Sequence, residues 1–128
     1  MSNTQQPRYA FILRANGEFE VTDWPTGGTL EFLRTAIDCH YVEAVTLSPH
    51  FTLWLDEEGR NAEKQINYQA SIFHAIYKEP NGFHHGTVVI TGGPINGETQ
   101  GLDCTEIATL AEFLLTFTGA RIPTQRTK

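Results

Sequence analysis

Histidines are the side chains of this chain best suited to proton transfer or metal binding. His84 and His85 are adjacent in a loop that glycines flank, and His74 precedes them in a helical pattern. Imidazole titrates near neutral pH and binds zinc when neutral. A zinc site needs three or four converging ligands, and the sequence has neither an HExxH motif nor a CxxC pair. We therefore predict no metal ion and no cofactor. His84 and His85 are candidates for contact with another kind of ligand.

A run of carboxylates, Asp56-Glu57-Glu58, is the second group that could do chemistry. Such a run could supply an acid/base pair or oxygen ligands for a divalent cation. Because neighbouring side chains of a strand point to opposite faces, only Asp56 and Glu58 would share a face. A solvated hairpin tip is the simpler interpretation, and we favour it. No residue is predicted to be catalytic.

Two further segments are candidates for ligand binding. Asn67 comes just before an apolar helical run, where an amide side chain most often caps the helix. The glycine-rich segment TGGPINGETQG follows an apolar strand pattern, but it lacks the P-loop lysine and the GxGxxG spacing. It leads to a predicted helix start, where free N–H groups attract anions. A turn followed by a helix cap explains this segment without a ligand. For the alternative, in which the segment binds a ligand, Gly93 and Asn96 join Asn67 as candidates.

These residues lie on a predicted alternation of strands and helices. Strand patterns cover residues 9–15, 18–23, 42–48, 51–56 and 87–91, and a short edge strand at 98–102. Helical spacing of apolar residues covers residues 30–39, 67–79 and 103–119. The pattern predicts an α+β fold in the order β-β-α-β-β-α-β-(β)-α. We expect a single mixed, mostly antiparallel sheet with about three helices packed on one face.

Local motifs predict how these elements begin and turn. Asn16-Gly17 favours a two-residue hairpin turn between the first two strands. Thr29 is the expected cap of the first helix. Asp103, followed three residues later by Glu106, matches a capping box with Asp in place of Ser or Thr. The last helix is therefore the most strongly predicted element.

Length and composition indicate one domain. The chain has 128 residues, of which 40% are hydrophobic, and a net charge of -6. A chain of this length buries roughly two-thirds of its unfolded surface in one core. We expect a disordered tail at 1–8, the domain at 9–119 and a basic tail at 120–128. Cys39 and Cys104 lack CxxC spacing and are expected to be free thiols.

Charge and hydropathy exclude two classes of partner. A chain with net charge -6 is a poor match for nucleic acid, since phosphate binding needs Lys and Arg gathered on one face. No apolar run approaches the roughly 20 residues that cross a bilayer, and the first residues show no secretory signal. We therefore expect a cytoplasmic protein that binds neither nucleic acid nor membrane.

The middle of the chain also matches a family pattern. Its points are Asp56-Glu57-Glu58-Gly59, then Asn67 and Ala70 in NxxA spacing, then Gly86 before Val88-Val89-Ile90, and finally Gly92-Gly93 with Gly101-Leu102 before the last helix. In this order they resemble the domain of unknown function 3846 family, found largely in phages and mobile elements of bacteria. The resemblance implies a small accessory protein and supplies no catalytic residues.

Three functional hypotheses follow from these observations. The first is a non-enzymatic accessory protein, encoded by a phage or plasmid, that binds a protein partner or a small-molecule ligand. The alternative is a small hydrolase or nucleotide-modifying enzyme that pairs His84 or His85 with Asp56 or Glu57. That alternative requires the four residues to meet in one pocket. The third is a homodimer formed through a strand edge or an exposed aromatic surface.

Overall fold

The computed structural model describes residues 7–60, 62–79 and 82–123, and its elements follow the predicted α+β order. The predicted edge strand at 98–102 is represented by the isolated bridges Ile95↔Glu98 and Tyr9↔Leu102. No described helix is both long and apolar enough to cross a membrane. The elements are β1 (Tyr9–Leu13), β2 (Phe19–Asp23), α1 (Thr29–Ile37), β3 (Val42–Thr46), β4 (Thr52–Asp56), α2 (Tyr68–Tyr77), β5 (Val88–Thr91) and α3 (Cys104–Phe117).

The strands form one sheet in the order β2-β1-β5-β4-β3. Each neighbouring pair of these strands is antiparallel. The predicted sheet was mixed and mostly antiparallel, and these five strands form a fully antiparallel one. β5 is the central strand, and its residues Val88, Val89 and Ile90 have no exposed surface. The edge strands are β2 and β3.

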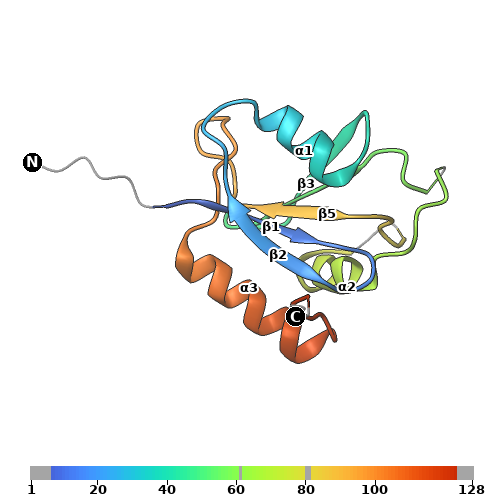
Figure 1. Cartoon of the computed structure of the whole chain (residues 1–128). Coiled ribbons are helices and arrows are strands. Elements are labelled where there is room, and N and C mark those ends of the chain that lie inside the picture. The colour runs from blue at the N-terminus through green and yellow to red at the C-terminus, as the bar shows by residue number, and fades with distance from the viewer. Residues whose placement is uncertain (1–6, 61, 80–81, 124–128) are drawn as a thin grey trace, which may run out of the picture.

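Helices cover both faces of this sheet. On one face Phe11 and Leu13 of β1 share a core with residues of α2 and α3, whereas Ala10 and Ile12 pack on the other face with residues of α1. Figure 1 shows α1 on one side of the sheet and α2 with α3 on the other. The expectation that the helices pack on one face is therefore wrong. The physical reason is that β1 and β5 are apolar on both faces, and each face must be covered.

Two helix caps are as the motifs predicted. The Asn67 side chain accepts a hydrogen bond from the Ala70 N–H (3.0 Å) at the start of α2. The capping box of α3 is complete, because Asp103 accepts from the Glu106 N–H (2.8 Å) and Glu106 accepts from the Asp103 N–H (3.0 Å). Local sequence determines both caps.

Two other local predictions are wrong. Thr29 is already helical, and the cap position belongs to Gly28, whose left-handed backbone (φ 64°) leaves its C=O to accept the first helical hydrogen bond. The first hairpin does not have a two-residue turn. Gly17 (φ 92°) donates to the Arg14 C=O, and Arg14 donates to the Glu18 C=O, which closes a three-residue loop of the bulged type.

The chain continues to pack beyond α3. Ala120 is buried, and the Arg121 N–H donates to the Gly17 C=O (2.8 Å) while the Phe19 N–H donates to the Arg121 C=O (3.0 Å). Residues 120 and 121 of the predicted basic tail thus lie against the first hairpin. Residues 1–6 and 124–128 of the two predicted tails lie outside the described residues.

Lys64 joins the end of β4 to the end of α1. Its ammonium group forms an ion pair with Asp56 (2.9 Å) and donates to the backbone carbonyls of Ile37 (3.1 Å) and Asp38 (2.7 Å). A cation at this position also interacts favourably with the negative end of the helix dipole. Asp56 is only 8% exposed, so Lys64 compensates a largely buried carboxylate.

We predict that Lys64→Met lowers the free energy of unfolding by about 2–4 kcal/mol, because it leaves the Asp56 carboxylate buried without its cation. Urea denaturation measures the change. The double variant Lys64→Met/Asp56→Asn should recover part of the loss. Lys78→Met, which removes an exposed lysine, is the matched control and should stay within about 0.5 kcal/mol of the wild type. A Lys64→Met variant as stable as this control would contradict the prediction.

Candidate functional site

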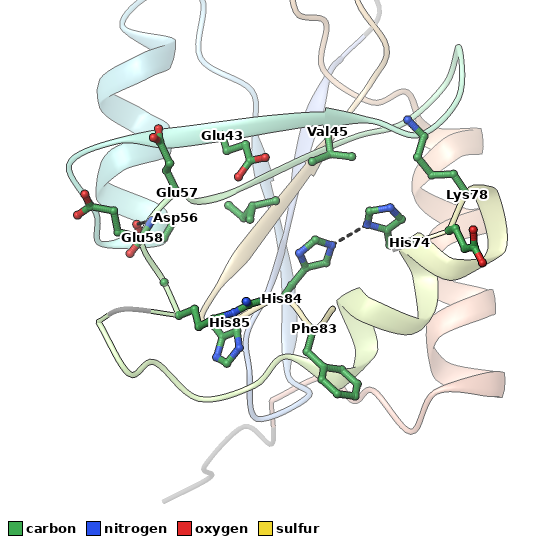
Figure 2. A pocket seen from close by; sticks show the side chains of 14 residues that line it. Glu43, Val45, Asp56, Glu57, Glu58, His74, Lys78, Phe83, His84 and His85 are labelled. Carbon is green, nitrogen blue, oxygen red and sulfur yellow. Dashed lines mark hydrogen bonds between the residues drawn. The ribbon is translucent and has the colours of Figure 1, made fainter. Parts of the chain in front are cut away.

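A cavity of about 510 Å³ lies between the β3–β4 edge of the sheet, the turn after β4 and the C-terminal end of α2. Its charged and imidazole side chains come from segments far apart in the sequence, as Figure 2 shows. The residues that line it are Glu43, Val45, Leu55, Asp56, Glu57, Glu58, Gly59, Arg60, His74, Lys78, Glu79, Phe83, His84 and His85.

The loop that carries His84 and His85 is held by a short antiparallel pairing with residues 65–67. The Asn67 N–H donates to the His84 C=O (2.8 Å), and the Gly86 N–H donates to the Gln65 C=O (2.7 Å). On the other side, the His84 N–H donates to the Ser71 hydroxyl (3.0 Å). The backbone at both histidines is therefore fixed by hydrogen bonds to residues 65–67 and to α2.

Asn67 is completely buried and connects the loop to the sheet. Its Nδ2 group donates to the backbone carbonyls of Leu13 (3.0 Å) and Gly86 (2.9 Å), while its Oδ1 caps α2. These bonds use both amide protons. The sequence named Asn67 both as a helix cap and as a ligand-binding candidate. In the structure Asn67 is buried, does not line the cavity and positions the loop.

Gly93 and Asn96, the other two candidates, are apart from the histidines. A Cβ atom at Gly93 would collide with the carbonyl group of Pro49, so this glycine permits close packing of two loops. Asn96 has a left-handed backbone (φ 53°) in a turn closed by hydrogen bonds between Ile95 and Glu98. The structure therefore brings together His84 and His85 and leaves Gly93 and Asn96 outside the cavity lining.

His74 is the residue of this site that the sequence did not single out as a candidate. Its Nδ1 lies 2.7 Å from Nε2 of His84, and the two rings are stacked with centroids 4.9 Å apart. In Figure 2 the His84 ring points toward His74, whereas the His85 ring points away from it. His85 instead places its Nδ1 2.9 Å from the Lys64 C=O. The sequence did contain one signal for His74: its helical spacing from Ala70 and Phe73 puts it on the buried face of α2.

Comparison with known proteins agrees with the resemblance seen in the sequence. A family model described as Domain of unknown function (DUF3846) matches residues 8–114, which is most of the chain. The chain belongs to the DUF3846 family. Neither a curated protein nor a solved structure matches it. The matched region of this DUF3846 protein includes the whole cavity lining.

The two stacked histidines of the DUF3846 protein resist protonation. Burial, followed by the neighbouring charges of His74 and His85, lowers the pKa of His84 to about 4. Burial, and then Lys78, lowers the pKa of His74 as well. Both rings are therefore neutral at pH 7, so the floor of the cavity carries no positive charge from this pair.

A hydrogen bond between two neutral imidazoles needs one N–H and one bare nitrogen. His74 Nε2 is buried and has no hydrogen-bond partner within the described residues. A buried unpaired N–H costs more than a bare nitrogen, so we assign the proton of His74 to Nδ1. His74 then donates to Nε2 of His84, and His84 carries its own proton on Nδ1.

The rim of the cavity is acidic. Its carboxylate residues are Asp56 and the exposed Glu43, Glu57, Glu58 and Glu79, whereas its cationic residues are Arg60 and Lys78. The Asp56 charge is balanced by Lys64, and Oδ1 of Asp56 also accepts a hydrogen bond from the Glu58 N–H (2.8 Å). Within the described residues, no group of three or more potential ligands could hold a metal ion. The exposed carboxylates thus outnumber the cations of the lining.

We predict that His84 makes stability depend on pH between about 6.5 and 4. Its pKa falls from an unfolded value near 6.5 to about 4, so the unfolded state takes up the proton first as pH falls. The contribution of His84 is complete above pH 6.5 and is lost toward pH 4. From pH 7 to pH 4, the wild type should lose on the order of 1–2 kcal/mol more unfolding free energy than His84→Gln.

Urea denaturation at pH 7, 5.5 and 4 tests this prediction. His85→Gln, which leaves the His74–His84 pair in place, is the matched control and should keep most of the wild-type pH dependence. Equal losses of stability in the wild type and His84→Gln would contradict the predicted role of His84.

Proposed function

We propose that this DUF3846 protein is a small binding protein whose cavity takes a positively charged group, such as an arginine or lysine side chain of a partner. The observation that carries the proposal is the combination of exposed carboxylates at the rim and a neutral histidine pair at the floor. Carboxylates that surround a concave surface attract cations and raise their local concentration. Because the two histidines are neutral, they do not oppose that charge.

The size of the cavity supports this proposal. A volume of about 510 Å³ lies within the usual range of roughly 300–1,000 Å³ for small-molecule sites and easily accommodates one long side chain. An arginine guanidinium can form two parallel hydrogen bonds with one carboxylate. Glu57 and Glu58 are exposed on the turn after β4 and are available for such a contact.

The hydrolase alternative has one specific observation in its favour. His84, His85, Asp56 and Glu57 line the same cavity, as that hypothesis requires. Two of the four are occupied, however, because His84 Nε2 bonds to His74 and Asp56 pairs with Lys64. An acidic rim also repels the phosphates of a nucleotide, which disfavours a nucleotide-modifying enzyme. A cation-binding role therefore has the stronger support.

The other parts of the accessory-protein and homodimer hypotheses stay predictions. These parts are that a phage or plasmid encodes the protein, that it has an accessory role in the cytoplasm and that it self-associates. The proposal for the cavity depends on none of them.

We predict that N-acetyl-arginine amide binds the cavity with a millimolar Kd, whereas N-acetyl-glutamate amide does not bind. Backbone amide shifts of Gly59, His84 and His85 in two-dimensional NMR titrations report the contact. Affinity for the arginine probe should fall as salt rises from 50 to 300 mM, because exposed charges are screened. Glu57→Gln/Glu58→Gln should weaken binding about tenfold or more.

The matched control is Glu31→Gln/Glu112→Gln, which makes the same change in net charge at exposed positions on α1 and α3. It should bind the arginine probe nearly as well as the wild type. Equal weakening in both double variants would show attraction to overall charge alone and would contradict the proposed site. Absence of arginine-induced shifts at the cavity residues would contradict it too.

A further inference from the structure

Helix α2 is apolar on its outer face as well as on its inner face. Ala70 and Phe73 are buried against the sheet, whereas Tyr68, Ile72 and Ile76 recur every four residues on the outer face and are 55%, 43% and 54% exposed. A surface helix of a globular protein ordinarily has one apolar stripe and an opposite polar face. The outer face of α2 is therefore of the kind that a partner covers.

A shallow apolar groove runs along this outer face. It has a volume of about 300 Å³, and its lining is almost wholly apolar. The rings of Tyr68 and Phe83 pack edge to face, with their centroids 5.7 Å apart, and form one wall of the groove. The lining residues are Tyr68, Ser71, Ile72, Ala75, Gly82 and Phe83.

The groove and the acidic cavity are neighbours that share one lining residue. Phe83 lines both of them, and it directly precedes His84 in the chain. In Figure 2 the Phe83 ring points away from the His74–His84 pair. The backbone of His84 is tied to α2 through the Ser71 hydroxyl, so the two concave surfaces have a fixed relation to each other. Together they present an apolar strip beside an acidic hollow.

We propose that this strip and hollow form one docking surface for an amphipathic helical segment of another protein that carries lysine or arginine. Its apolar side chains, spaced three or four residues apart, would occupy the groove beside Ile72 and Phe83. Its basic side chain would enter the acidic cavity. The inference rests on the proposed cation-binding function of that cavity and adds the class of partner.

Charge complementarity selects this occupant over two others. The chain has a net charge of -6, so two copies repel each other and would place acidic rims close together. A membrane rich in anionic lipids is repelled for the same reason. A basic amphipathic segment gains attraction from the charge and burial from the apolar strip.

Peptide display tests the proposal with random sequences in place of a natural partner. A library of random 16-residue peptides is selected on the wild-type protein and counter-selected on the bare support. We expect enriched peptides with apolar residues at helical spacing and at least one lysine or arginine. Absence of enrichment over the bare support, or enrichment of acidic peptides, would overturn the proposal.

Affinities of the enriched peptides, measured by fluorescence anisotropy, separate the two parts of the surface. We expect Ile72→Ser/Ile76→Ser to weaken binding at least tenfold and Glu57→Gln/Glu58→Gln to do the same. Leu30→Ser/Leu115→Ser removes exposed leucines from α1 and α3 and is the matched control, with affinity near that of the wild type.

The remaining outcomes distinguish failure of this inference from failure of the proposed function. Binding that needs Glu57 and Glu58 but not Ile72 and Ile76 would overturn the docking surface and leave cation binding intact. Binding that needs the isoleucines but not the carboxylates would overturn the role of the cavity. A dimer in analytical ultracentrifugation that Ile72→Ser/Ile76→Ser abolishes, or binding to phosphatidylcholine–phosphatidylglycerol vesicles, would assign the apolar face to a different occupant.

Discussion

The structure around the candidate site depends on one buried amide. Asn67 joins the end of β1, the loop before β5 and the first turn of α2 through hydrogen bonds to Leu13, Gly86 and Ala70. This side chain has no exposed surface. A buried polar group that loses its partner costs about 1–3 kcal/mol, so the spacing of these three segments is strongly constrained.

That constraint produces both halves of the proposed binding surface. With Gly86 held against β1, the His84 ring stacks on His74 at the floor of the cavity and stays neutral because it is partly buried. The same loop places Phe83 beside the outer face of α2. The acidic turn after β4 closes the other side of the cavity. One interior contact therefore positions an acidic hollow next to an apolar groove, and this juxtaposition is the basis of the proposed function.

Sequence patterns predicted what depends on near neighbours in the chain. The order of elements and the capping box at Asp103 follow from local periodicity and local hydrogen bonds. Patterns did not show that α1 covers the opposite face of the sheet, because the choice of face depends on tertiary packing. For the same reason His74 was not recognised as part of the site, since its partner His84 reaches it only through the folded loop. Gly93 was predicted to bind a ligand, but its close contact with Pro49 gives a packing reason for glycine there.

Native-state hydrogen exchange on Asn67→Ser measures whether this one side chain holds the loop and the sheet together. Serine can still cap α2, but it cannot donate to the carbonyls of Leu13 and Gly86. We predict that the N–H groups of His84 and Gly86 lose protection at least about tenfold more than those of the β4–β5 pair, which corresponds to about 1.4 kcal/mol of local opening. Equal loss of protection throughout the sheet and the loop, or no loss at the loop, would contradict the claim that Asn67 holds the site together.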